Sequence, residues 1–314
     1  MLQKYQGCFL GLAIGDALGL PTEFLSLAQI HQAYGPTGVE DLMGCHGFPP
    51  GTFTDDTQMS IALAEALLAA DGSDLDTQMQ AVARRFVAWA GSPENNRAPG
   101  NTCMSACRRL AEGASWRESG VAGSKGCGTA MRTAPIGLLY HRDQTTMLRV
   151  AIASSQITHG HPCALAGGVA TALAVSLALD NTPPLAILET VVEVCQPIST
   201  EFAAHVARVP ALLGTSPAAA MVELGEAWVA EEAIACALYC FLRTPDDYRA
   251  TVLCGANSEG DSDSIACIAG AISGAYNGLD AVPVEWRERV ENRELLQDLA
   301  TRLYHRRSPL TAVG

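Results

Sequence analysis

Two adjacent aspartates, Asp55 and Asp56, lie between two threonines in the stretch GTFTDDT, residues 51–57. A proline–glycine turn precedes them, and an apolar run with helical spacing, residues 61–70, follows. An acid at a helix start often caps backbone N–H groups and suits the positive end of the helix dipole. Capping uses one side chain, however, and here two threonines and two aspartates stand together. Such clustered oxygen donors suit Mg²⁺, Mn²⁺ or Ca²⁺ better than zinc, which prefers His and Cys.

A similar acidic stretch, EGDSDS, occupies residues 259–264 and again opens an apolar helical run, residues 265–276. If the two helix starts meet in the fold, Asp55, Asp56, Asp261 and Asp263 converge and repel one another unless cations neutralise them. Two metal ions about 3.5–4 Å apart, bridged by carboxylates, would satisfy that requirement. The pattern therefore predicts a dinuclear site with oxygen ligands.

Glu23 follows a Gly-Leu-Pro break and has apolar neighbours. A free carboxylate would be costly in such surroundings. Two interpretations stay open: Glu23 is a solvated loop acid, or it is a fifth carboxylate of the metal site.

Two further stretches contain residue types that suit ligand binding. In SKGCGTAMR, residues 124–132, small residues allow a ligand to approach the backbone, and successive N–H groups can hold phosphate. Nothing near Cys127 marks it as a nucleophile. His159 and His161 could bind zinc only with a third ligand, and none is adjacent, so we expect a ligand-contacting or helix-capping role.

The elements that must position these residues read as helices. We expect helices over residues 27–34, 55–70, 75–90, 163–179, 231–242, 246–254 and 265–276, and a charged, solvated helical face over 285–307. Gly7, Gly11 and Gly15 form one smooth stripe that lets another helix pack closely. No period-2 alternation and no strand–helix–strand rhythm is found. We therefore predict an all-α fold, a single compact multi-helix domain over residues 1–314.

The composition excludes several functional classes. The net charge is −13 and no run of Lys or Arg occurs, which argues against nucleic acid or an anionic membrane surface as the main partner. The 11 cysteines form no CxxC pair, and most of them are expected to be small buried apolar residues in a reducing compartment. No signal peptide is visible, and the uncharged stretch 163–179 is expected to be a buried helix. These features predict a cytoplasmic protein without a membrane span.

Taken together, the motifs resemble those of the ADP-ribosylglycohydrolase family. The resemblance extends from Gly7 to about Gly278 and depends on the order of several motifs. These are GLAIGDALG (11–19), TDDT (54–57), GCGTAMR (126–132), TH (158–159) and GDSDSIA (260–266).

The resemblance implies an all-α fold with two Mg²⁺ or Mn²⁺ ions in a cleft that binds ADP-ribose. It implies these metal ligands, with Glu23 close by: Thr54, Asp55, Asp56, Asp261, Asp263 and Ser264. Ser264 is a departure, because the family often has Thr there. The residues implied to line the ADP-ribose pocket are Gly100, Asn101, Thr102, Ser124, Gly126, Cys127, Gly128, Met131, Arg132 and His159.

The implied reaction is hydrolysis of the bond at ribose C1″, with Asp56 or Glu23 as the base or proton shuttle. The layout of the motifs, which resembles that of the bacterial members of the family, and the loop at residues 124–129 favour ADP-ribosyl-arginine on a protein as the substrate. Serine-linked or small-molecule conjugates are the alternative, and a non-catalytic ADP-ribose-binding or partner-occluding protein is another. A third hypothesis is that the chain is a structural protein stabilised by Ca²⁺. The sequence does not indicate the oligomeric state.

Overall fold

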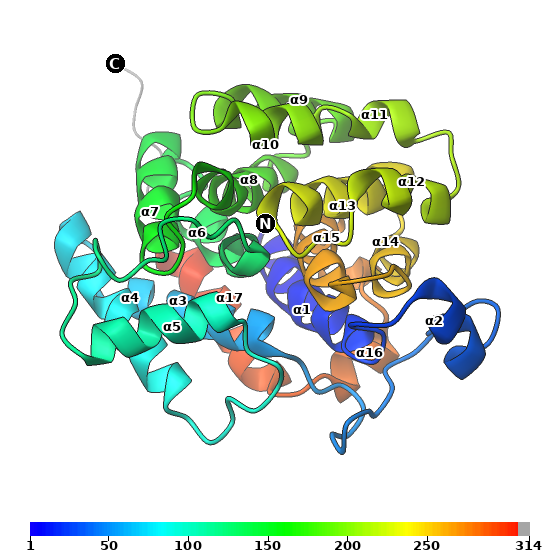
Figure 1. The fold of residues 1–314 in the computed structure, drawn as a ribbon, viewed down its shortest axis with the longest axis horizontal. Helices are drawn as coiled ribbons and strands as arrows, with labels where there is room; N and C mark the ends of the chain where they lie inside the picture. The colour runs from blue at the N-terminus through cyan, green and yellow to red at the C-terminus, as the bar shows by residue number, and fades with distance from the viewer. Residues whose placement is uncertain (307–314) are drawn as a thin grey trace.

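A computed structural model describes residues 1–306 of the chain (Figure 1). The described residues are mainly helical and contain no β-strand, only three isolated bridge pairs. The prediction of an all-α fold is confirmed. The helices are α1 (Leu2–Gly19), α2 (Leu27–Tyr34), α3 (Asp55–Ala69), α4 (Leu75–Ala90), α5 (Asn101–Ala111), η1 (Cys127–Arg132), α6 (Ala134–Leu139), α7 (Gln144–Gln156), α8 (Pro162–Leu179) and α9 (Pro184–Cys195). The remainder are α10 (Thr200–Val206), α11 (Val209–Leu212), α12 (Pro217–Leu224), α13 (Ala230–Arg243), α14 (Tyr248–Ala256), α15 (Ser262–Asn277), η2 (Leu279–Ala281), α16 (Val284–Arg289) and α17 (Arg293–Arg306).

Helices α1 and α15 form the centre of the fold and run antiparallel in backbone contact. A Cβ atom at Gly15 would lie 2.0 Å from the carbonyl oxygen of Ala266, and one at Gly19 would lie 2.3 Å from the Cα of Asp263. Only glycine permits this approach, so the close packing predicted from the glycine stripe is confirmed. Because the helices are antiparallel, the end of α1 lies beside the start of α15, which carries the second acidic stretch.

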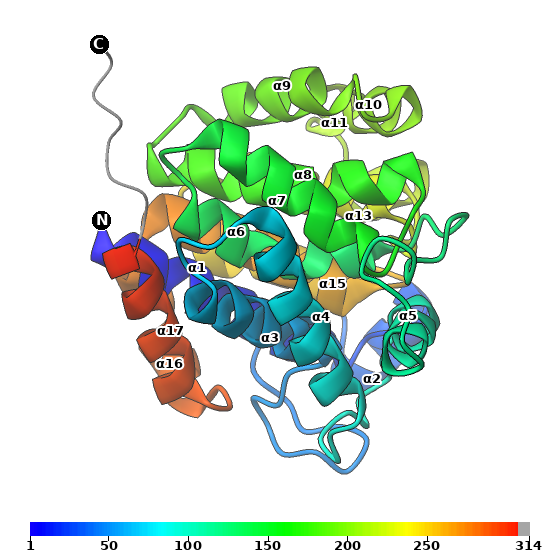
Figure 2. The ribbon, with the colours of Figure 1, turned by 90° about the vertical axis from the view of Figure 1, so that its left-hand side faces the viewer.

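The other helices cover this pair in layers (Figure 2). Helices α8 and α13 pack on one side, with α9, α10 and α11 outside them, while α3, α4 and α17 lie on the other side. Within residues 1–306, α8 alone is long and apolar enough to span a membrane, and 83% of it is buried inside the fold. It therefore serves as a core helix, as the sequence predicts.

The boundaries of most predicted helices agree with the structure to within about three residues. In the segment 285–307 the described residues are helical and most of their charged side chains are exposed, as predicted, but the prediction missed the buried side of the segment. Two helices, α16 and α17, occupy this segment with a break between them, and residue 307 lies outside the described residues. Trp286, Leu296 and Leu303 are fully buried. The segment therefore also contributes to the core, because these three side chains lie on the side that packs against α1 and α3, whereas Val284 and Leu295 are exposed.

Candidate active site

The two acidic stretches meet at the starts of α3 and α15. The Ser264 hydroxyl donates a hydrogen bond of 2.9 Å to Oδ2 of Asp56. Thr54 caps α3 by accepting the Asp56 N–H at 3.3 Å, so neither aspartate is needed as the cap. Asp261 stands at the cap position of α15, but its side chain makes no capping hydrogen bond. The capping interpretation therefore leaves the carboxylates unexplained, and their convergence is confirmed.

Asp16 holds the first of these helix starts in place and was not predicted as a site residue. Its carboxylate accepts the N–H of Thr54 at 2.8 Å and both the N–H and the hydroxyl of Thr57, at 3.0 and 2.6 Å. The side chain is fully buried on α1. The signal in the sequence was an acid inside a glycine-spaced apolar helix, where a carboxylate is costly unless several donors surround it.

Glu23 lies with the aspartates, so the interpretation as a solvated loop acid is wrong. One carboxylate oxygen each from Glu23, Asp261 and Asp263 lies within 4.8 Å of the other two. Oδ1 of Asp263 is buried and has no hydrogen-bond partner. A buried oxygen without a partner beside other carboxylates fits a metal ion, since a cation would supply the missing interaction.

The charges of the cluster are not balanced by basic side chains. Burial, together with the surrounding carboxylates, raises the pKa of Glu23 to about 11 and that of Asp55 to about 8. Burial and Asp263 raise the pKa of Asp56 well above its ordinary range. Within residues 1–306 none of the cleft acids forms an ion pair with Lys or Arg. The residues present therefore fit divalent cations, which would ionise and neutralise these acids.

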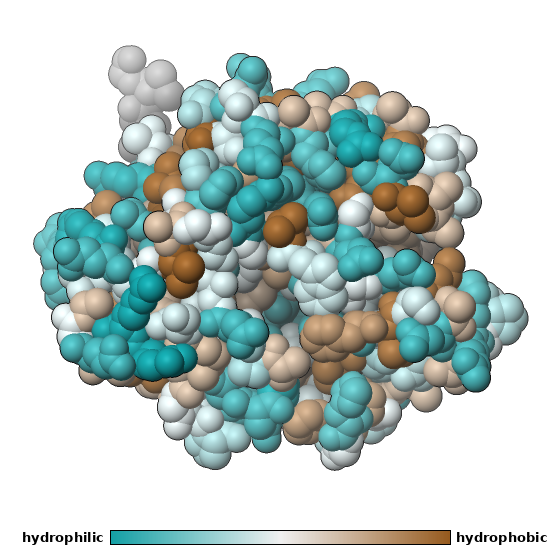
Figure 3. Space-filling model, viewed as in Figure 1, coloured by the Kyte–Doolittle hydropathy of each residue, from teal (hydrophilic) through white to brown (hydrophobic). Residues whose placement is uncertain are grey.

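A cavity of about 360 Å³ opens above the acids, beside the start of α5. Figure 3 shows a recess near the middle of this face. Most residues expected in the ADP-ribose pocket line it, together with the acids Glu23, Asp55, Asp56, Asp261 and Asp263 and the hydroxyl residue Ser264. They are Gly100, Asn101, Thr102, Gly126, Cys127, Gly128, Met131 and His159.

Three residues expected at the site do not line the cavity. Thr54 lies beneath it as the cap of α3. Ser124 lies behind Thr102, with their hydroxyl oxygens 2.9 Å apart. Arg132 is fully buried in the wall, where it donates to the carbonyl of Gly128 at 2.5 Å and to the Thr158 hydroxyl at 2.7 Å. Arg132 therefore supports the 126–132 segment.

Two aromatic residues at the mouth, Phe24 and Trp228, line the cavity and were not predicted. Their rings stack with centroids 5.2 Å apart and an interplanar angle of 18°. Both are exposed, at 62% and 38%. No sequence motif linked these positions, because they are brought together only by the turn at residues 258–261.

His159 and Cys127 face the cavity with different chemistry. Nδ1 of His159 lies 2.8 Å from the Thr158 hydroxyl, and burial, with the nearby Arg132, lowers the pKa of His159 to about 3. The imidazole is therefore neutral. The Cys127 thiol donates to Asp261 at 2.8 Å, and burial with that carboxylate raises its pKa well above the ordinary value. It lacks the thiolate character of a nucleophile, as the sequence predicts.

The sequence pattern of ADP-ribosylglycohydrolases matches residues 1–311. The chain belongs to the ADP-ribosylglycohydrolase family. Human ADP-ribosylhydrolase ARH3 is 29% identical, over 96% of this chain and 93% of its own length. ADP-ribosylarginine hydrolase Tri1 of Serratia proteamaculans is 25% identical, over 97% of this chain and 80% of its own length. A solved structure described as an ADP-ribosylglycohydrolase-related protein complex superimposes with a TM-score of 0.76 at 30% identity, covering 98% of this chain and 99% of that chain.

Family membership agrees with the resemblance found in the motifs. The family consists of hydrolases of ADP-ribose conjugates and generally uses divalent metals, and the acidic cleft of this member offers the ligands. The shared all-α fold covers nearly the whole chain.

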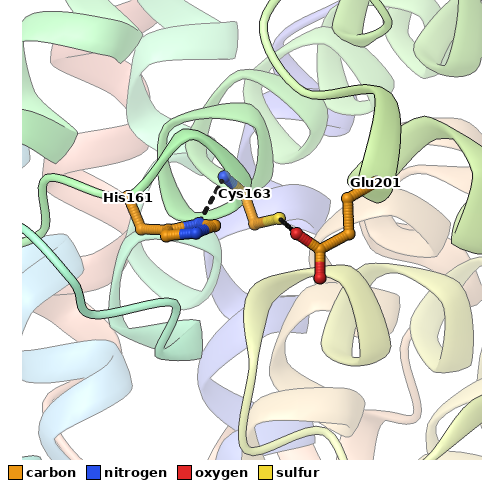
Figure 4. Close-up of side chains that lie close together, drawn as sticks. All are labelled: His161, Cys163 and Glu201. Atoms are coloured by element: carbon orange, nitrogen blue, oxygen red, sulfur yellow. Dashed lines mark hydrogen bonds between the residues drawn. The ribbon is translucent and has the colours of Figure 1, made fainter.

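A second cluster of possible metal ligands lies elsewhere in this family member, at the start of α8 (Figure 4). Donor atoms of His161, Cys163 and Glu201 lie within 4.8 Å of one another. His161 caps α8 by accepting the N–H of Cys163 at 3.2 Å, as one of the two predictions for it stated. The ammonium group of Lys125 pairs with Glu201 at 2.6 Å and also with the buried Glu231. A side-chain cation therefore already balances this cluster.

Proposed function

We propose that the chain hydrolyses the glycosidic bond between ADP-ribose and the side chain of an arginine in a protein, with the help of two divalent cations. The observation that carries the proposal is the meeting of the two acidic helix starts at the floor of one cavity. The cavity also contains the glycine-rich segment 126–128 and the neutral His159.

The cation ligands that we propose are the six side chains expected from the sequence, with Glu23 at the edge of the cluster. Thr54 and Ser264 are buried between the aspartates and provide neutral oxygens. The partnerless Oδ1 of Asp263 and the raised pKa values of Glu23 and Asp55 support this assignment. Bound Mg²⁺ or Mn²⁺ would act as a Lewis acid toward ribose hydroxyls.

The chain's own residues provide proton transfer and orientation. Water adds its oxygen to ribose C1″, the bond from C1″ to the side-chain nitrogen breaks, and that nitrogen takes the bonding electron pair and the proton that the water gives up, so that arginine leaves. Asp56 lies at the floor, oriented by the Ser264 hydroxyl, whereas Glu23 lies near the mouth beside Phe24. Either carboxylate is placed to accept the proton of the attacking water.

The start of α5 offers a site for the pyrophosphate. This helix begins at Asn101 without any side-chain cap, and its first residues line the cavity, so its uncapped N–H groups would suit an anion there. Next to this helix, Gly126 and Gly128 lie against the His159 ring, where added Cβ atoms would approach it to 3.0 Å. The glycines therefore keep the imidazole accessible to a ligand.

The arginine linkage has support from the name of one relative, ADP-ribosylarginine hydrolase Tri1, and from the layout of the 124–129 loop. Serine-linked and small-molecule conjugates are the competing substrates. Cytoplasmic location stays a prediction from the sequence.

The test measures the release of free ADP-ribose from an arginine-ADP-ribosylated protein and from a serine-linked substrate. Each substrate is assayed with Mg²⁺, with Mn²⁺ and with EDTA. We expect metal-dependent release from arginine alone. Release from serine alone would overturn the linkage. No release from either substrate, with ADP-ribose still bound, would instead favour the binding-protein alternative.

The roles of Asp56 and Glu23 have a separate test. The variants Asp56→Asn and Glu23→Gln are each assayed for turnover and for bound metal. Loss of turnover with metal retained assigns proton transfer to the replaced acid, and unchanged turnover in both variants contradicts the proposed role.

A further inference from the structure

A groove of about 690 Å³ lies beside the active site, between α2, α12 and α14, and is larger than the catalytic cavity. Its walls are mainly apolar and include Leu27, Met221, Val222 and Leu253. Val222 is 79% exposed. Figure 3 shows hydrophobic residues over α12 and beside α2 on this face. A concave, mainly apolar groove of this volume is typical of sites that bind another molecule.

Acidic residues accompany the apolar walls. Glu40, Glu226 and Glu259 line the groove, and no Lys or Arg occurs among its described lining residues. Glu40 and Glu226 are exposed. The whole chain carries a net charge of −13. The groove is therefore complementary to a partner that combines apolar and basic side chains.

The groove and the catalytic cavity share one wall. The Glu259 carboxylate in the groove accepts the N–H of Leu27 at 2.6 Å, four residues after the cleft acid Glu23. A second backbone contact belongs to the same wall: the carbonyl of Glu226 accepts the N–H of Asp261 at 2.9 Å. Each segment thus has one residue in the groove and one in the cleft.

The top of this wall is the exposed aromatic pair of Phe24 and Trp228. Phe24 is three residues from Leu27, and Trp228 is two residues from Glu226. An apolar path therefore leads from the mouth of the cavity over the aromatic pair into the groove. When a modified side chain enters the cavity, the polypeptide that carries it can continue across this rim into the groove.

We propose that the groove binds the polypeptide of the ADP-ribosylated substrate, in particular a segment with apolar and basic residues beside the modified one. This inference deepens the proposed function and rests on it. The groove then selects among modified proteins, while the cavity recognises the ADP-ribose that they share.

The test compares two substrates with the linkage that the wild-type protein cleaves. One is the free ADP-ribosylated amino acid, and the other is a synthetic peptide with Leu and Lys residues around one ADP-ribosylated residue. The groove variant carries V222K and E40K. The matched control carries L185K and E189K on α9, where Leu185 and Glu189 are also exposed and the change in charge is the same.

We expect kcat/KM of the groove variant to fall about tenfold or more for the peptide, because like charges now face each other. Its kcat/KM for the free amino acid should stay within about twofold of wild type, as surface changes usually do. The control variant should match wild type on both substrates.

Equal turnover of the peptide by the groove variant and wild type would overturn the proposal. A dimer in sedimentation that V222K and E40K disperse, with peptide turnover unchanged, would assign the groove to a second copy of the chain. Failure of the wild-type protein to cleave either substrate would contradict the proposed function itself, which separates the two failures.

Discussion

Two acidic clusters in this protein balance their negative charge in different ways. At the start of α8, Glu201 and Glu231 share the ammonium group of Lys125. In the active-site cleft, the starts of α3 and α15 bring four aspartates and Glu23 together with no Lys or Arg paired to them within the described residues. Both clusters offer donor atoms at metal-binding distances.

Because only the α8 cluster is paired with a basic side chain, proximity of ligand atoms alone does not define a metal site. Lys125 lowers the pKa of Glu201, and those two carboxylates raise the pKa of Lys125, so the α8 cluster is stabilised as it stands. In the cleft, burial and mutual repulsion raise the pKa of the acids instead. The cleft needs cations from outside the chain, whereas the α8 cluster does not.

The largest expected effect comes from removing one acid of each cluster. Asp263→Asn removes the carboxylate with the partnerless oxygen and should lower kcat/KM for ADP-ribose release about 10³-fold or more, because several kcal/mol of Lewis-acid stabilisation depend on the metal site. Glu231→Gln removes a buried acid of the α8 cluster and should change kcat/KM by less than about threefold. Equal losses in the two variants would show that the comparison is wrong.

The pH dependence of stability should also separate the clusters. In metal-free protein, Asp55 has a pKa raised to about 8 and Asp16 one raised to about 7, each by burial and then by Asp263. Acids with raised pKa values keep their protons in the folded state while the unfolded chain ionises, so stability is lost as pH rises through those values. The free energy of unfolding in EDTA should therefore fall by several kcal/mol between pH 5 and pH 8.

Denaturant unfolding at several pH values measures this slope. Saturating Mg²⁺ or Mn²⁺ should remove it, and Asp55→Asn should reduce it in EDTA. A slope that is unaffected by metal would contradict the assignment of the cations to these acids.

A smaller effect is expected from Lys125→Met, which converts the α8 cluster into an unbalanced one. Removing one partner of a buried ion pair costs about 3–5 kcal/mol, and the partial exposure of Lys125 reduces this to about 2–3 kcal/mol. The second change Glu231→Gln should recover much of the loss. Zn²⁺, which suits His161 and Cys163, should stabilise the single variant and leave wild type unchanged. A variant as stable as wild type would show that Lys125 does not balance the cluster.

Much of the fold could be predicted because helical periodicity is a local property of the sequence. The stripe of Gly7, Gly11 and Gly15 even predicted backbone contact between helices, although not that α15 was the partner. In the segment 285–307 the exposed charged side was predicted, but the buried side was missed, because its few buried side chains are recognisable only when the surface of α1 and α3 that they cover is known.

The site residues that stand next to one another in the sequence were predicted. Those that come together only through the tertiary structure were missed. The Asp pairs stood out by their types and spacing, and the Ser264–Asp56 hydrogen bond confirms that they meet. Asp16 was missed because its role depends on the N–H groups of another helix. Arg132 was expected in the pocket, but its hydrogen bonds place it in the wall.

The most direct test of the account is the number of Mn²⁺ ions bound per chain, measured by equilibrium dialysis on EDTA-treated protein at neutral pH. We expect two Mn²⁺ ions per chain in the wild-type protein and in the Glu231→Gln variant. In the Asp263→Asn variant we expect weakened or lost binding. No bound Mn²⁺ or Mg²⁺ in wild type, or equal binding in Asp263→Asn, would contradict the claim that cations complete the cleft.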